Sequence, residues 1–352
     1  MRRTSPSPSC GRMALRWLAP SAVVCVALVA GCGPSARSGL AGSPATSAAG
    51  GLAGKANQII ASALSDPDPR IRSNAIEVAA STQGLRFAPS VRRLIRDPVV
   101  PVRFAAILAV GDLHYAVARP DVQQIVDETK EDPNVRLAAA YALCRLGLAR
   151  YADDLRKAVS SPNQTVRANA ALVLGKAGDT KALDVLHWAM QDKDSDEQVL
   201  IQAAESIAML GDGRIYQRLW GKLISAYADD RIAGIRAMGA LGTEQASNAI
   251  LTMLNDGVVE VRLTAAAQLG RLHDTTGQIK VLEALKNGPA TASPAEETGS
   301  PSRARVLAAL AIGEIGTEPL VKCLPRLLDD RSTFVKVAAA KAVLMQGSKA
   351  TR

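Results

Sequence analysis

The chain has 352 residues, of which 48% are hydrophobic but only 3% aromatic, and its formal net charge is +9. Much of the apolar material is Ala and Leu, which favour helices, whereas strand-rich proteins draw on β-branched and aromatic residues. A nucleic-acid binder would carry a continuous basic stripe with interleaved aromatic residues, and none is visible, so we expect no nucleic-acid partner. The composition therefore favours an all-α protein.

Residues 1–31 are typical of a secretory signal peptide. An apolar run from Trp17 to Ala30 is too short to span a membrane comfortably. The charges of this leader are all basic: Arg2, Arg3, Arg12 and Arg16. Without them the net charge falls from +9 to +5. The true start is either Met1 or Met13.

The apolar run ends in Val29, Ala30, Gly31 and Cys32, which together resemble the bacterial lipobox. The small residues Ala30 and Gly31 suit cleavage in an extended conformation, and the resemblance implies that the Cys32 thiol is acylated. Several acyl chains anchor a protein stably where one does not. The alternative is an ordinary signal peptide with a chance cysteine. We predict a lipid-anchored protein on the extracytoplasmic side of the cell envelope, at the outer membrane or the periplasmic face of a Gram-negative cell.

Residues 32–53 are rich in Gly, Ala, Ser and Pro, with a single charge at Arg37. Such a segment has little apolar surface to bury and behaves as a flexible coil. A coil of about 20 residues has a root-mean-square reach of roughly 25 Å. We therefore expect a flexible tether between the membrane and the folded body.

From residue 54 to 348 the chain repeats itself, at steps of 31 or 33 residues with one longer step of 43. Copies of the clearest unit begin at Ile71, Val102, Val135, Val166, Val199, Asp230, Val261, Ala304 and Val335. Apolar residues recur within the unit at the spacing of one helical face. The fifth residue is always small: Ala75, Ala106, Ala139, Ala170, Ala203, Gly234, Ala265, Ala308 and Ala339. Small side chains at this position allow neighbouring helices to approach closely.

A second, shorter apolar-periodic segment precedes each unit, and turn signals such as Asp97-Pro98 separate the two. Asp can cap the following helix, and Pro suits its first turn. The thirteenth residue is often a glycine that can end a helix: Gly147, Gly178, Gly211, Gly242, Gly316 and Gly347. Each repeat should be a helical hairpin. About nine hairpins should stack into a right-handed α-solenoid with the form of a curved rod.

The pattern Asp-Pro…Val-Arg-x-x-Ala-Ala-x-Ala-Leu-Gly resembles the HEAT-like repeats of bacterial proteins, including the short type of the phycobilisome lyases. The resemblance covers residues 54–348. Because such arrays are mainly binding scaffolds, it implies a protein client on the concave face. Residues 287–302 account for the longer step and are rich in Gly, Pro, Ser, Thr and Ala, so we expect a disordered insert there. Residues 349–352 form a short tail.

The second residue of the unit is basic in eight of the nine copies, with Leu200 as the exception. The eight are Arg72, Arg103, Arg136, Arg167, Arg231, Arg262, Arg305 and Lys336. An acid often lies five residues before the unit, as at Asp66, Asp97, Asp194, Asp256 and Asp330. We predict a structural ladder in which each base bonds turn carbonyls and aspartates of its own or the next repeat. The alternative is an anion-binding stripe along the array.

The aromatic residues Tyr216, Trp220 and Tyr227 are spaced as if they share one helix. We interpret them as packing at a degenerate repeat, with a binding patch as the alternative. Two cysteines of the array, Cys144 and Cys323, lie in distant repeats and are expected to act as small buried hydrophobes rather than to form a disulfide.

The histidines are His114, His187 and His273, and each lies repeats away from the next. In deoxyhypusine hydroxylase, an enzyme with related repeats, His-Glu dyads hold two irons; here the following residues are Tyr115, Trp188 and Asp274. We therefore expect no metal, no cofactor and no small-molecule ligand. The prediction is a membrane-anchored, non-catalytic scaffold for protein–protein interaction. The alternative is an enzyme or enzyme accessory related to the phycobilin lyases or deoxyhypusine hydroxylase.

Overall fold

The computed structural model describes residues 44–287 and 300–350. In these ranges the chain forms α-helices, short 3₁₀ turns and connecting loops, without a strand. The predicted leader 1–31, the lipobox residues Val29, Ala30, Gly31 and Cys32, and the last two residues of the tail lie outside these ranges. No helix of the described residues combines the length and the apolar character needed to cross a membrane.

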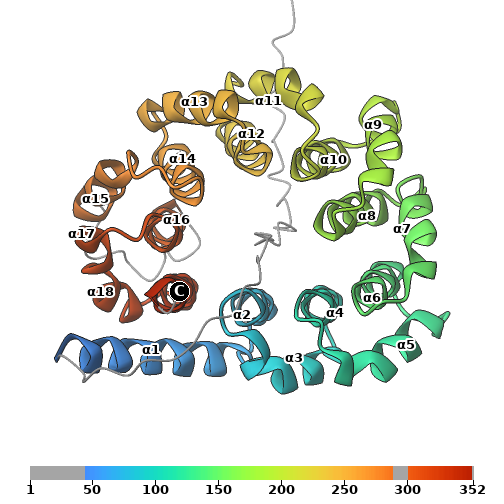
Figure 1. Cartoon of the computed structure of the whole chain (residues 1–352), viewed down its shortest axis with the longest axis horizontal. Helices are drawn as coiled ribbons and strands as arrows, with labels where there is room; N and C mark the ends of the chain where they lie inside the picture. The colour runs from blue at the N-terminus through green and yellow to red at the C-terminus, as the bar shows by residue number, and fades with distance from the viewer. Residues whose placement is uncertain (1–43, 288–299, 351–352) are drawn as a thin grey trace, which may run out of the picture.

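The helices form two concentric layers (Figure 1). The inner layer contains the nine copies of the repeated unit, in α2 (Pro69–Thr82), α4 (Val100–Asp112), α6 (Pro133–Arg145), α8 (Gln164–Ala177), α10 (Glu197–Met209), α12 (Ala228–Leu241), α14 (Val259–Arg271), α16 (Ser300–Ile315) and α19 (Thr333–Ala350). The outer layer contains α1 (Pro44–Ala63), α3 (Ala88–Leu94), α5 (Arg119–Asp127), α7 (Ala152–Ala158), α9 (Leu183–Gln191), α11 (Tyr216–Leu223), α13 (Glu244–Thr252), α15 (Gln278–Asn287), α17 (Glu318–Val321) and α18 (Leu324–Leu328). The predicted all-α solenoid of two-helix repeats is confirmed.

The solenoid closes into a ring, because its first and last helices meet (Figure 1). Both α1 and α2 pack against α19. Lys55 of α1 also pairs with Asp329 at 2.5 Å, and the Arg70 guanidinium lies 5.4 Å from the centre of the Phe334 ring. The open curved rod expected from the repeat pattern is therefore wrong. Closure buries the two end surfaces that an open array would leave in water.

The first helix begins inside the segment that we expected to be a tether. Residues 44–53 of the predicted tether 32–53 are helical and belong to α1. Ala56 and Ile60 of the same helix are fully buried, and α1 packs along α19. Composition failed here because Ala-rich sequence forms helix readily once a neighbouring helix covers it, and packing supplies most helical stability in proteins.

The small fifth residue of each unit lies in the core, as predicted. Ala75, Ala106, Ala139, Ala170, Ala203, Ala265 and Ala339 are completely buried. Gly234 is the tightest case, since a Cβ atom there would lie 2.9 Å from Cβ of Lys222. Close contact between α11 and α12 therefore requires a glycine at this position.

Most inner helices end in a residue with left-handed backbone conformation. Gly178 ends α8 with φ of 71°, and His114 and His273 occupy the same position of their repeats with φ of 50° and 66°. Gly347 is an exception to the predicted stops, because it lies inside α19. Of the predicted insert 287–302, Asn287 belongs to α15 and residues 300–302 to α16, and the rest lies outside the described ranges.

Candidate functional site: a pocket at the interruption of the arginine ladder

Five of the repeated basic residues form ion pairs with an acid of the next repeat. The pairs are Arg72–Asp97, Arg103–Glu131, Arg167–Asp192, Arg231–Asp256 and Arg305–Asp330. In all but the second, 25 residues separate the partners. The acid also holds its own turn: Asp97 Oδ1 accepts a hydrogen bond from the Val99 N–H at 2.9 Å. Each of these carboxylates thus connects two consecutive repeats.

The remaining basic residues make other contacts. Arg262 donates to the carbonyl of Asp256 at 2.7 Å, and Lys336 donates its backbone N–H to Ser332 at 3.1 Å. Arg136 has Ser161 at the 25-residue position and donates instead to the carbonyl of Val126 at 3.3 Å. Asp194 was singled out by sequence spacing, but it is exposed, and Asp192 takes the place beside Arg167.

The ladder is interrupted at α10, where both members of the pair are replaced. Leu200 stands at the basic position, and Ser225 stands 25 residues later, where most pairs have an aspartate. Removing one partner of a buried ion pair leaves an uncompensated charge and is strongly destabilising. The joint replacement avoids that cost, and it removes two long polar side chains from the interface between repeats.

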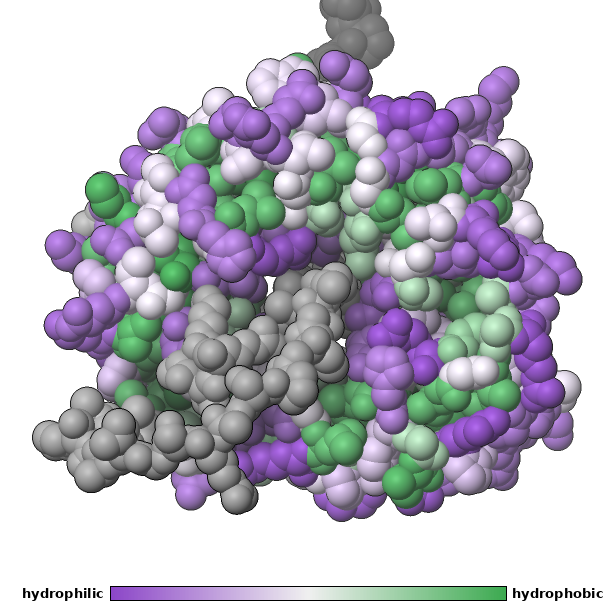
Figure 2. Space-filling model, in the orientation of Figure 1, coloured by the Kyte–Doolittle hydropathy of each residue, from purple (hydrophilic) through white to green (hydrophobic). Residues whose placement is uncertain are grey.

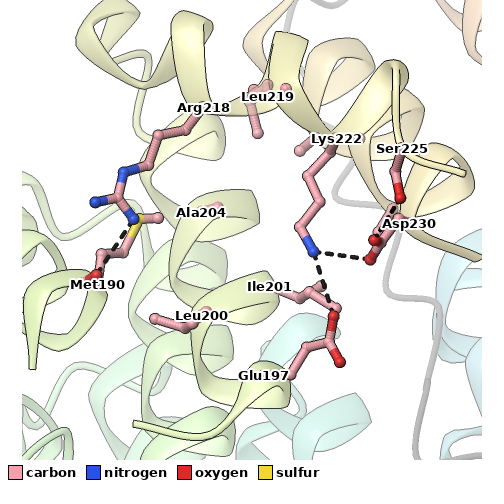
Figure 3. A pocket seen from close by; sticks show the side chains of 14 residues that line it. Met190, Glu197, Leu200, Ile201, Ala204, Arg218, Leu219, Lys222, Ser225 and Asp230 are labelled. Atoms are coloured by element: carbon pink, nitrogen blue, oxygen red, sulfur yellow. Dashed lines mark hydrogen bonds and ion pairs between the residues drawn. The ribbon is translucent and has the colours of Figure 1, made fainter. Parts of the chain in front are cut away.

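A pocket of about 630 Å³ lies at this interruption, between α10, α11 and α12 (Figure 3). Its apolar wall comes from Met190, Leu200, Ile201, Ala204, Leu219, Ala233 and Ala237, and its polar side chains are Glu197, Arg218, Lys222, Ser225 and Asp230. Cavities of this size, largely apolar with a few polar groups, are typical of small-ligand sites.

Lys222 occupies one side of the pocket between two carboxylates. Its Nζ atom donates to Asp230 Oδ1 at 2.7 Å and to Glu197 Oε1 at 3.3 Å, and Ser225 Oγ donates to Asp230 Oδ2 at 2.8 Å. Burial lowers the pKa of Lys222, but the hydrogen bonds to Asp230 and Glu197 outweigh it and raise the pKa above its ordinary value. Lys222 is therefore a cation at neutral pH, and it is poorly suited to act as a nucleophile.

Arg218 lies on the opposite side of the pocket from Lys222 (Figure 3). Its NH1 group donates to the carbonyl of Met190 at 3.3 Å. Within residues 44–287 and 300–350, no ion pair joins it to a carboxylate. A guanidinium has five N–H donors, so most of the hydrogen-bonding capacity of Arg218 remains available to a ligand.

Exposed apolar side chains lie next to the pocket in sequence. Trp220, Ile224 and Tyr227 are 39%, 69% and 76% exposed. Trp220 stacks on Tyr216 with ring centres 6.5 Å apart. The interpretation of the aromatic set as packing on one helix is wrong for Tyr227, because α11 ends at Leu223 and Tyr227 lies just before α12.

The histidines do not build a metal site. His114 and His273 lie at helix ends, and His187 Nε2 lies 2.8 Å from Asp212 Oδ2. No group of three or more His, Cys, Asp or Glu side chains that could hold a metal is present in the described part of the chain. The residues present therefore do not fit the two-iron site that the resemblance to deoxyhypusine hydroxylase would imply.

The two array cysteines are unpaired, and Cys144 and Cys323 are both half-buried. Burial raises the pKa of the Cys144 thiol to about 11. A thiol of this pKa is a poor nucleophile at neutral pH, so Cys144 is not a candidate catalytic residue.

Comparison with known proteins agrees with the repeat architecture. The HEAT-repeat family matches residues 89–164 and 152–223, and the second match includes α10 and α11 of the pocket. At the level of its repeats, the chain is a HEAT-like solenoid protein.

A deoxyhypusine hydroxylase from Arabidopsis thaliana is 28% identical over 193 residues, which are 54% of this chain. The match spans 61% of that enzyme's length, which is less than two thirds of it. Human deoxyhypusine hydroxylase in complex with glycerol is similar over 87% of this chain and all of its own, with 18% identity and a TM-score of 0.34. The CpcE–CpcF complex of phycocyanin lyase from Nostoc sp. PCC7120 is similar over 73% and 94%, with 16% identity and a TM-score of 0.39. These structural similarities are distant, and no argument below rests on them.

The sequence relation corrects two of our expectations. We predicted a membrane-anchored, non-catalytic scaffold and no enzymatic role, but the curated relative is an enzyme. The repeat pattern could not exclude catalysis, because it is set by helix packing and says nothing about the few non-repeated residues on which chemistry depends.

Proposed function

We propose that the chain is an enzyme, or the accessory subunit of an enzyme, that acts on a protein client held by the ring. The observation that carries the proposal is the 28% identity to a deoxyhypusine hydroxylase over 193 residues. Because the histidines do not fit a two-iron site, the proposal does not extend to that enzyme's reaction.

The inner surface of the ring supports binding of a polar segment of the client. Lys176 of α8 reaches past α6 to Asp112 of α4 at 2.9 Å, which alternate helices of a ring achieve on its concave side. Arg236 of α12 pairs with Glu205 of α10 at 3.0 Å. Figure 2 shows hydrophilic side chains beside the central opening. A surface with charges of both signs favours a polar chain over an apolar one.

We further propose that the protein is exported and anchored through an acylated Cys32. The support is the basic start, the short apolar run and the sequence Val29-Ala30-Gly31-Cys32. Anchoring would confine the chain and its client to one membrane surface and raise their effective concentration.

Client capture followed by mass spectrometry tests the enzymatic proposal. The full chain is cross-linked in cells, and the captured proteins are compared with the same proteins from cells that lack it. We expect at least one client to carry a chemical change that depends on the chain. Incubation of the unmodified client with the purified chain then separates an enzyme from an accessory. Captured proteins with identical masses in both strains would contradict the proposal.

Fractionation tests the anchor separately. Wild-type chain is expected in the membrane fraction, and the Cys32→Ala chain in the soluble extracytoplasmic fraction. If the wild-type chain is also soluble, the anchoring proposal is wrong, and the enzymatic proposal is unaffected.

A further inference from the structure

We propose that the pocket between α10, α11 and α12 binds an amphipathic anion, namely a small aliphatic carboxylate. This inference goes beyond the proposed function and does not depend on it. It also revises the expectation that no small molecule binds.

The first argument is the origin of the pocket. In neighbouring repeats the corresponding interface contains an arginine and its aspartate, as with Arg231 and Asp256, whose side chains are only 14% and 10% exposed. At α10 the replacements Leu200 and Ser225 shorten both side chains together. The lining also includes Gly221, where a Cβ atom would meet nothing within 4 Å. Space that other repeats fill with an ion pair is thus left open here.

The second argument is the balance of charge around the pocket. The carboxylates of Glu197 and Asp230 both bond Lys222. Arg218 has only the Met190 carbonyl at 3.3 Å. The group that remains unmatched is therefore a cation. A guanidinium presents parallel N–H donors that suit the two oxygens of a carboxylate.

The third argument concerns the rest of the ligand. Leu200, Ile201 and Leu219 give the pocket an aliphatic wall, and none of the lining residues is aromatic. Such a wall stabilises an aliphatic chain by burial of apolar surface and offers no ring for stacking. Arg218 at the side of this wall places the charged end of the ligand.

Decanoate is the probe that tests the inference, with decanol and decylammonium as matched neutral and cationic probes. Binding is measured by titration calorimetry on the full chain carrying Cys32→Ser, so that neither lipid nor detergent competes. We expect saturable binding of decanoate and weaker binding of the other two probes. Absence of saturable decanoate binding, or equal binding of decylammonium, would overturn the inference.

Two pairs of variants locate the site. Gly221→Phe should fill the pocket and weaken decanoate binding by about tenfold or more, whereas Gly54→Phe, at another exposed helical glycine with nothing within 4 Å of a Cβ, should leave it unchanged. Arg218→Gln should weaken decanoate by about tenfold and leave decanol unchanged, with exposed Arg119→Gln as control. Circular dichroism confirms that each variant is folded. Unaltered decanoate binding by folded Gly221→Phe would place the ligand elsewhere and contradict the inference.

Discussion

Lys341 of α19 and Glu77 of α2 lie 264 residues apart in the chain, and their side chains meet at 3.0 Å between Nζ and Oε1. Both side chains are largely buried, at 7% and 18% exposed. The pair therefore joins the last inner helix to the first, and it sits at the junction where the ring closes.

Breaking this pair should weaken ring closure. Lys341→Met leaves the Glu77 carboxylate without this partner, and we expect the free energy of unfolding to fall by about 2–4 kcal/mol. Chemical denaturation measures the loss, and hydrogen exchange should show it first in α1 and α19. The double variant Glu77→Gln/Lys341→Met should recover part of the stability. If exchange in α1 and α19 is unchanged in the single variant, the pair does not maintain closure.

Restoring the ladder at α10 should close the pocket. In the double variant Leu200→Arg/Ser225→Asp, the two new side chains are expected to pair as Arg231 and Asp256 do. Each single change introduces a charge without its partner, so the double variant should be more stable than the singles predict, by about 1–3 kcal/mol of coupling energy. A double-mutant cycle by urea denaturation measures it. Additive single effects would mean that the repeats differ here in more than two residues.

Overpacking at a fifth position should push neighbouring inner helices apart. Ala170 is completely buried in α8, and Ala170→Phe is expected to cost about 1–3 kcal/mol. Thermal unfolding measures the change, and Gln191→Phe at the exposed end of α9 provides the control. Equal melting temperatures for the two variants would contradict the packing that we describe.

Stability should depend on pH through Asp212. Hydrogen bonds from Arg214, and from His187, lower the pKa of this carboxyl below its ordinary 3.8, against the opposing effect of burial. A lowered pKa stabilises the fold above pH 3.8, and this contribution is lost as the pH falls through the folded pKa. Asp212→Asn should therefore lower the melting temperature at pH 7, and its difference from wild type should shrink on acidification towards pH 2. A constant difference across this range would rule out the assignment.

The repeated positions made the fold predictable from sequence. Nine small residues at one helical position require stacked hairpins, and the glycine stops locate most helix ends. Ring closure was not predictable in this way, because Lys341 and Glu77 belong to no periodic pattern. Gly347 failed as a stop because α19 continues past it along the closed ring.

The pocket left a signal that could have been found. Leu200 was noted as the one exception in the basic series, but its meaning depends on Ser225, 25 residues later. The separation of 25 residues becomes visible only when the partners are seen in space. Arg218 belongs to no repeated position, so its place beside the pocket required the structure.

A closed circle has no terminal repeat. Every hairpin has a neighbour on each side, so the array cannot fray inward from an end, and loss of order must begin by parting α19 from α1 and α2. A polypeptide held inside such a circle could enter or leave only by threading end-first or by waiting for that seam to open. The seam would then set how long a captured chain stays in place.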